Sequence, residues 1–325
     1  MNILICGLGS IGMRHFRILK QLGVDNIYAY RTGTATLELT ADKAEHPDQV
    51  FTTLSDTLDA QIDAALVTNP TSMHIETAQF FAERSIPLFI EKPLSHNLDG
   101  LEKLSATVSS NDVPVLVGYN LIFHPAILRL RTLLKNNKIG KIISVKAHWG
   151  SYMPDWHPWE DYRKSYASIR KKGGGAVLTL SHELNFLTLF FGKAKKVMAM
   201  QAAIPAIEIG CDEGVDILIH HESGVISNSH LNFFQKPYRR SLEIIGTNGT
   251  ILWNFMTPQI RILNDKTEEV LDLGIDAGVL LDESYKNQMQ HFLDVVKGNE
   301  ESKVSLEKGI EDQRLFMKIL ADISQ

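Results

Sequence analysis

Several features that mark specialised classes of protein are scarce or missing in this 325-residue sequence. Cysteine occurs only at Cys6 and Cys211, which argues against a disulfide-stapled secreted scaffold. No apolar run reaches the roughly 18 residues of a membrane-spanning helix, and the N-terminal residues lack the pattern of a cleaved signal peptide. The net charge of −5 gives no excess of positive charge for nucleic acid or an acidic membrane surface. We therefore expect a cytoplasmic protein that binds neither nucleic acid nor membrane.

A glycine pattern stands at the start of the chain. The apolar run 3–5 predicts a buried strand and 13–22 predicts a helix, with Gly7, Gly9 and Gly12 between them in G-x-G-x-x-G spacing. In such a unit the glycines allow a tight turn, close approach of a pyrophosphate and close helix packing, and the helix N-terminus faces the phosphates. The alternative is a glycine-rich turn that binds nothing. We favour a dinucleotide site that also includes Ser10 and Ile11.

An acidic residue is missing at the end of the second predicted strand, 26–30. An Asp or Glu there would bind the ribose hydroxyls of NAD. Arg31 and Thr32 follow instead, and a guanidinium with a neighbouring hydroxyl can bind the 2′-phosphate of NADP. The alternative is an exposed arginine on a loop. The cofactor is therefore NAD or NADP, and these residues favour NADP.

The first 121 residues alternate between predicted strands and helices. Further apolar strands are expected at 63–67, 87–90 and 113–117, and Thr71 or Ser72 is expected to cap the helix after the first of these. This alternation predicts a doubly wound parallel sheet, whose ligands bind at the carboxyl ends of the strands. The residues expected at such ends are Gly7, Arg31, Asn69 and Lys92.

The pattern changes in the second half of the chain. A helix is expected from the glycines at 173–175 to about Phe191, and two more at 285–297 and 306–323. Most of the strands there have no helices between them, and a Glu222–Gly224 turn joins two of them, so we predict a largely antiparallel sheet. The expected strands are 142–148, 197–203, 215–221, 225–234, 241–246 and 251–255. The domain boundary is placed near Leu121.

Three histidines in these strands suggest a metal site at first sight. His220 and His221 are adjacent, so their side chains point to opposite faces of a strand. His230 stands apart from both, and no carboxylate or cysteine spacing completes a ligand set. We expect no metal.

Taken in order, these motifs resemble the glucose–fructose oxidoreductase / inositol dehydrogenase / MocA (Gfo/Idh/MocA) family of NAD(P)-dependent sugar oxidoreductases. The resemblance covers essentially the whole chain, and Glu91-Lys92-Pro93 at a strand end is its most specific element. The motifs that carry it are Gly7-x-Gly9-x-x-Gly12, Thr68-Asn69-Pro70 with His74, Glu91-Lys92-Pro93, Gly118-Tyr119-Asn120 with His124-Pro125, Gly173-Gly174-Gly175 with His182, and Gly246-Thr247-Asn248-Gly249.

The resemblance implies an α/β protein with two domains. A Rossmann domain, 1–121, would bind NAD(P), and an α/β domain with an open, mostly antiparallel sheet, 122–325, would bind substrate and form a homodimer or homotetramer. It places Lys92 beside the nicotinamide. The cofactor-binding residues assigned on this basis are Gly7, Gly9, Ser10, Ile11, Gly12, Arg31, Thr32, Thr68, Asn69, His74, Glu91 and Lys92.

The sequence departs from the family where an Asp and, four residues later, a His are usual. Thr179 stands at the Asp position, His182 follows after three residues and Glu183 after four. Residues three and four apart share a helix face, so either His182 or Glu183 can be the acid/base partner. We favour His182 because the ordinary histidine pKa, about 6.5, suits proton transfer at neutral pH. The Ser-His-Glu order resembles enzymes of cell-surface or nucleotide-linked sugars.

The long loop before the glycines has the mixture of aromatic and polar groups that a sugar pocket uses. Its alternative is a packed loop at a subunit interface. The residues assigned to substrate binding are Tyr119, Trp156, His157, Trp159, Thr179, His182 and Glu183, and those assigned to catalysis are Lys92 and His182.

These residues predict hydride transfer between nicotinamide and a hydroxyl or keto carbon of a sugar or sugar derivative. Two other functions stay open. One is an NAD-dependent glycosidase or epimerase-like enzyme that oxidises its substrate transiently. The other is a cofactor-binding regulator that has lost catalysis, which Thr179 favours and which Lys92 and His182 argue against.

Overall fold

The computed structural model describes residues 1–32, 46–158 and 160–324. By packing, the chain forms two compact units. The first unit is Met1–Tyr119 together with Tyr285–Gln313, and the second is Asn120–Ser284 together with the end of the chain from Arg314. The sequence placed 285–313 in the second domain, whereas this segment packs with the first unit.

The contacts of the segment 285–313 with the first unit explain this difference. The Phe292 ring lies edge-on to that of Phe89 with centroids 5.6 Å apart, and the Val117 amide donates to the Val304 carbonyl oxygen at 2.9 Å. Hydrophobic periodicity shows which face of a helix is buried, but it does not show which sheet covers that face.

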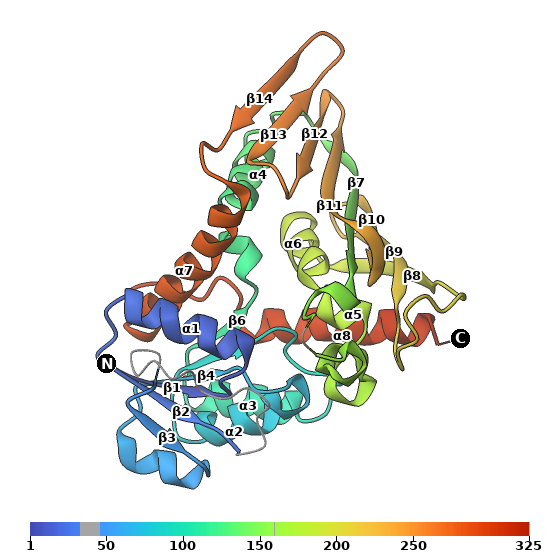
Figure 1. The fold of residues 1–325 in the computed structure, drawn as a ribbon. Coiled ribbons are helices and arrows are strands. Elements are labelled where there is room, and N and C mark those ends of the chain that lie inside the picture. Colours follow the sequence, from blue (N-terminus) through green and yellow to red (C-terminus); the bar gives the residue numbers. More distant parts are fainter. Residues whose placement is uncertain (33–45, 159, 325) are drawn as a thin grey trace. The chain divides into compact units, whose positions relative to one another are not determined.

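The first unit is built on a six-stranded sheet in the order β3-β2-β1-β4-β5-β6 (Figure 1). Every neighbouring pair is parallel. The strands are β1 (Asn2–Cys6), β2 (Asn26–Tyr30), β3 (Gln49–Phe51), β4 (Ala64–Val67), β5 (Leu88–Glu91) and β6 (Val115–Gly118). The predicted doubly wound parallel sheet is confirmed, and this strand order places its ligand crevice between the ends of β1 and β4.

The helices of this unit are α1 (Ser10–Gln21), α2 (His74–Ala82) and α3 (Leu101–Ser110), with 3₁₀ turns η2 (Ser55–Ala60) and η3 (Thr71–Met73). The predicted cap of α2 at Thr71 or Ser72 is wrong, because both residues lie in η3 and Met73 holds the N-cap position. The Met73 amide donates to the Pro70 carbonyl oxygen at 2.7 Å, an i→i−3 bond that closes a tighter turn before the α-helix.

The second unit is built on an eight-stranded sheet in the order β14-β13-β12-β11-β7-β10-β9-β8 (Figure 1). Only β7 and β10 pair in parallel, so the sheet is mostly antiparallel, as predicted. The strands are β7 (Ile142–Tyr152), β8 (Ala194–Gln201), β9 (Gly214–His221), β10 (Ile226–Asn232), β11 (Phe234–Gly246), β12 (Gly249–Asn254), β13 (Gln259–Leu263) and β14 (Glu268–Asp272).

One face of this sheet carries the core. Side chains of β7, β11, β12 and β13 pack with those of α4 (Pro125–Lys135) and α6 (His182–Phe191) into one buried apolar cluster. Alternation along β9 leaves Leu218 and His220 on the exposed side and buries His221, which contacts the Gly192 carbonyl oxygen and Ser227 Oγ, both at 2.8 Å. The expectation that the two adjacent histidines face opposite sides is confirmed.

The single helix predicted between the glycines and Phe191 is wrong. The structure has a short helix α5 (Ala176–Thr179) and then α6, with Leu180 and Ser181 between them. Ser181 occupies the N-cap position of α6, a position where serine is favoured. Thr179 therefore does not share a helix face with His182.

The remaining helices are α7 (Ala277–Val296) and α8 (Leu306–Asp322), and the 3₁₀ turns are η4 (Asn120–Phe123), η5 (Met153–Asp155), η6 (Tyr162–Lys164), η7 (Tyr166–Ser168) and η8 (Arg170–Lys172). In the part of the chain that the structure describes, no helix combines the length and the apolar character that crossing a membrane requires.

Candidate active site

In the glycine loop of the first unit, close packing leaves no room for a side chain at Gly7 and Gly12, whereas Gly9 has open space beside it. Gly7 has φ +106°, and a Cβ there would lie 2.7 Å from the Asn69 backbone, while a Cβ on Gly12 would collide with the Gly7 carbonyl oxygen. Gly9 differs, since a Cβ there would meet no atom of the described residues within 4 Å. Gly7 and Gly12 are thus required by the protein's own packing, and Gly9 leaves room for a group that approaches the backbone, which fits a dinucleotide.

The N-terminus of α1 follows directly. Gly9 is its N-cap residue, Ser10 is exposed and Ile11 is half-buried. The first turn contains no acidic residue, so the positive end of the helix dipole is available to phosphate groups. The residues present therefore fit the pyrophosphate of a dinucleotide.

The loop after β4 is tied to its neighbours by two predicted cofactor residues. Thr68 Oγ1 donates to the Gly7 carbonyl oxygen at 2.7 Å. His74 lies with Nε2 2.9 Å from the Asn69 carbonyl oxygen and Nδ1 3.0 Å from that of Pro93. Burial lowers the pKa of His74. Both side chains hold loops in place around the crevice.

Glu91, the last residue of β5, belongs to a buried pair that the sequence analysis missed. Glu91 Oε1 lies 2.8 Å from Nε2 of His15 on α1, and Glu91 Oε2 accepts from the Lys92 amide at 3.0 Å. A signal for His15 existed, because position 15 falls among the buried residues Phe16 and Leu19 of α1. A polar side chain at such a position requires a partner.

Arg31 and Thr32 directly follow β2. The Arg31 amide donates to the Phe51 carbonyl oxygen at 2.9 Å, which fixes the backbone at the strand end. The Arg31 side chain is partly exposed, and Thr32 is exposed. Residues 33–45, which follow, lie outside the described part of the chain.

In the second unit, His182 is the first residue of α6 and its side chain is buried. Its ring centroid lies 6.0 Å from that of Trp149 on β7. Thr179, the last residue of α5, is also buried. Of these two predicted substrate residues, Thr179 thus lies before the break between α5 and α6, and His182 lies after it.

Glu183 forms a buried ion pair with Arg240, 57 residues away. The guanidinium donates through Nε at 2.6 Å and through Nη2 at 3.1 Å, and the two residues are 2% and 5% exposed. The guanidinium carbon lies 3.6 Å from the ring centroid of Trp149 and 4.7 Å from that of Phe255. Both carboxylate oxygens of Glu183 are thus engaged by Arg240.

Two titratable side chains near Arg240 have pKa values shifted by burial. Burial, and secondarily the charge of Arg240, lower the pKa of His124 to about 4. His124 is therefore neutral near pH 7, and its Nδ1 accepts from the Ala126 amide at the start of α4. Burial likewise raises the pKa of Tyr238. No sequence pattern pointed to Arg240.

The other predicted substrate residues differ in burial. Tyr119 is buried. The Trp156 indole N–H donates to Ser151 Oγ at 2.6 Å, and its ring lies edge-on to that of Phe233. His157 is partly exposed, and Trp159 lies outside the described residues.

Comparisons with known proteins match both parts of the chain to one family. Residues 1–119 match a family described as "Oxidoreductase family, NAD-binding Rossmann fold", and residues 127–252 match the "GFO/IDH/MocA C-terminal domain". The chain belongs to the Gfo/Idh/MocA family of oxidoreductases. The resemblance noted from its motifs is thereby confirmed, and the first unit is an NAD(P)-binding domain of that family.

Individual proteins are similar to this chain over nearly their whole length. Myo-inositol 2-dehydrogenase of Thermotoga maritima is 27% identical over 95% of this chain and 92% of its own. The structure of levoglucosan dehydrogenase with NADH and levoglucosan matches with a TM-score of 0.82 at 15% identity, over 100% of this chain and 97% of that one. The structure of the WlbA dehydrogenase of Bordetella pertussis with NADH and UDP-GlcNAcA matches with a TM-score of 0.83 at 16% identity, over 100% and 95%.

The pair of Glu183 and Arg240 allows a stability test. Arg240→Met leaves the Glu183 carboxylate buried without its partner, so the free energy of unfolding should fall by about 3–5 kcal/mol. Denaturant unfolding measures this. Adding Glu183→Leu should recover most of the loss, because an apolar pair can replace a buried ion pair.

The matched control is the exposed pair of Arg261 and Glu268, whose atoms also lie 2.6 Å apart. Arg261→Met should change the free energy of unfolding little, because exposed ion pairs contribute little to stability. A loss for Arg240→Met no larger than for Arg261→Met would contradict the structural role of the buried pair.

Proposed function

We propose that the protein transfers hydride between a bound NAD(P) and a hydroxyl-bearing carbon of a sugar or polyol. The observation that carries this proposal is the place of Lys92, which directly follows β5 in the sheet that presents the glycine loop. Its amide is held by Glu91, so the backbone at this strand end has a defined position. Family membership supports the reaction class.

The bound cofactor supplies the hydride acceptor or donor. Lys92 would bind the reacting hydroxyl through Nζ and hold or release its proton, and His182 is proposed as a second group for proton transfer. Oxidation of an alcohol removes one hydride and one proton, so a group that handles the proton is required. We propose the two-residue assignment of Lys92 and His182 on this ground.

For substrate, we propose a polyol or sugar of the kind named for the relatives. A cyclic polyol such as myo-inositol is the first class to test, because that sequence relative aligns over nearly the whole chain. Levoglucosan and nucleotide-linked sugars come second, since they are bound by structural relatives. Net formation of NAD(P)H also distinguishes this reaction from an internally recycled one, in which the cofactor returns to its starting state.

For the cofactor, we propose that Arg31 allows the site to accept NADP. Arg31 stands at the end of β2, where an acidic residue would otherwise select the ribose hydroxyls of NAD, and its side chain is partly exposed.

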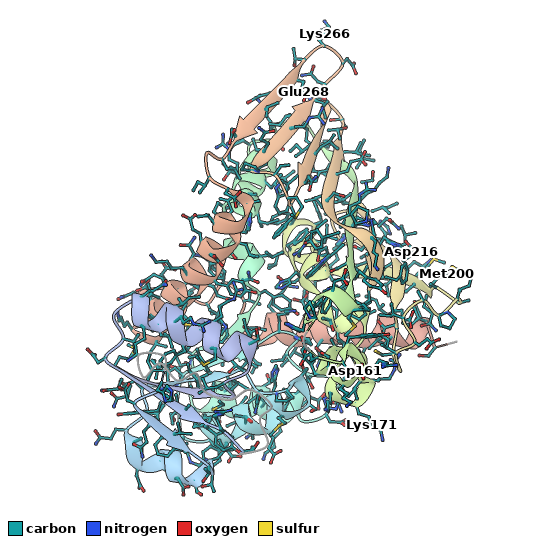
Figure 2. The ribbon with its side chains drawn as sticks, in the orientation of Figure 1. Asp161, Lys171, Met200, Asp216, Lys266 and Glu268 are labelled. Atoms are coloured by element: carbon teal, nitrogen blue, oxygen red, sulfur yellow. The ribbon has the colours of Figure 1, made fainter. Side chains whose placement is uncertain are left out.

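We also propose a homodimer or homotetramer that uses the outer face of the second sheet. Four large apolar side chains are exposed there on neighbouring strands, with exposed fractions of 43–78%: Met198, Met200, Leu218 and Ile226. Figure 2 shows Met200 and Asp216 on this edge, and the strand register pairs the two residues across β8 and β9. Exposed apolar patches of this kind mark contact surfaces, and a second copy of the chain would cover them.

Replacing Lys92 tests the catalytic proposal. Lys92→Ala removes the group that handles the hydroxyl proton, so turnover should fall by about 10²-fold or more, while the cofactor dissociation constant stays unchanged. NADH fluorescence titration and steady-state assays measure the two quantities. Lys103→Ala, an exposed lysine of the same unit, should match the wild type. Comparable turnover in Lys92→Ala would refute the assignment.

Replacing Arg31 tests the cofactor proposal. Arg31→Ala should weaken NADPH binding by about tenfold, because a charge-assisted hydrogen bond contributes about 1.5–3 kcal/mol, and should leave NADH binding nearly unchanged. Fluorescence titration with both cofactors measures the ratio. Equal effects on both, or a wild-type preference for NADH, would make Arg31 irrelevant to cofactor choice.

Charging the exposed apolar face tests the oligomer. Met198→Glu combined with Met200→Glu buries two carboxylates in the proposed interface, so light scattering should report a smaller assembly. Met256→Glu is the control, since Met256 is equally exposed in the turn after β12. A monomeric wild type would end this proposal.

A further inference from the structure

We propose that His15 and Glu91 are positioning residues that fix the backbone of Lys92 relative to the glycine-loop helix. This inference rests on the proposed function of Lys92 and adds to it a device in the same unit. None of the family comparisons assigns a role to His15.

The geometry gives each oxygen of Glu91 a separate donor. Oε1 lies 2.8 Å from His15 Nε2, and Oε2 accepts from the Lys92 amide at 3.0 Å. His15 is completely buried and Glu91 is 6% exposed. One carboxylate thus joins α1, which begins at the glycine loop, to the first residue after β5.

The proton on His15 has one good position. Nδ1 is buried and has no hydrogen-bond partner among the described residues, whereas Nε2 faces a carboxylate oxygen. A proton on Nδ1 would bury an unsatisfied donor, so the favoured position of the ring proton is Nε2. His15 then donates and Glu91 accepts at both oxygens.

The imidazole is also held from its sides. Its ring lies edge-on to Phe89 at 5.0 Å and to Tyr285 at 6.2 Å between centroids, and the Arg14 guanidinium carbon lies 4.6 Å from the centre of the Tyr285 ring. Rotation of the imidazole away from Glu91 is therefore opposed by packed rings on two elements.

Stability alone does not account for a polar pair at this place. Apolar side chains of similar volume are often at least as stabilising as a buried polar or charged pair. A hydrogen-bonded pair adds direction, because it restricts where Glu91 and the Lys92 amide can lie. Small displacements of a reacting group, of about 1 Å, can cost about 10²-fold in rate.

The test compares His15→Leu with His15→Gln. Leucine removes the donor, whereas the glutamine amide reaches about as far as Nε2 and can still donate to Glu91. His15→Leu should lower the rate of hydride transfer in single turnovers by about 10²-fold, with unchanged cofactor affinity and unchanged KM for substrate. His15→Gln should restore most of the rate.

Glu91→Gln adds a second variant. The glutamine side chain has only one oxygen acceptor, so either His15 or the Lys92 amide loses its acceptor. It should lower the hydride-transfer rate as His15→Leu does, and combining the two should cost little more than either alone.

A matched control exists in the same unit. His291 is also buried, and its Nδ1 lies 2.6 Å from the Glu300 carboxylate. Both residues of this pair are far from Lys92 in the sequence. His291→Leu should lower the midpoint of thermal unfolding to a similar degree as His15→Leu without changing the hydride-transfer rate.

The outcomes separate this inference from the proposed function. Loss of turnover in Lys92→Ala with a normal rate in His15→Leu would overturn the positioning role alone. A rate in His15→Gln no higher than in His15→Leu would do the same, as would an equal loss in His291→Leu. Full turnover in Lys92→Ala would instead overturn the proposed function, and the role of the pair with it.

Discussion

The close packing of α1 on the loop after β1 is the constraint on which the first unit depends. Gly12 lies against the carbonyl oxygen of Gly7, and Gly7 in turn lies against the backbone of Asn69. No side chain fits on Gly7 or Gly12 at these contacts, and the Thr68 hydroxyl adds a hydrogen bond from the loop after β4 to the Gly7 carbonyl oxygen. The same packing puts the N-terminus of α1 beside the strand ends, where a dinucleotide phosphate would be bound.

Parallel strands extend this arrangement across the sheet. β1, β2, β4 and β5 are neighbours, and each ends at the same edge. Gly7, Arg31, Thr68 and Lys92 directly follow these four strands. Residues that bind the cofactor are therefore expected directly after these strands. For this reason, short motifs at strand ends carry much information about function.

The parts of the fold that could be predicted were those that local pattern determines. Buried strands such as β1, with its run 3–5, show as apolar runs, and the glycine spacing marks the turn after β1. Three strands were missed, because β3 is only three residues long and β13 and β14 form an exposed hairpin with few buried side chains. The break before α6 was also missed, since helix propensity hardly distinguishes Leu180 and Ser181 from their neighbours. Tertiary packing determines both the missed strands and the break before α6.

The polar pairs beside the candidate proton-transfer residues show the same limit at the site. Glu91 precedes Lys92 and Glu183 follows His182, and both glutamates are buried. In sequence they resemble possible acids or bases. In the structure, His15 and Arg240 occupy their oxygens, and these partners stand 76 and 57 residues away. A carboxylate next to a catalytic candidate can thus hold the backbone instead of moving a proton, and only the partner across the fold distinguishes the two roles.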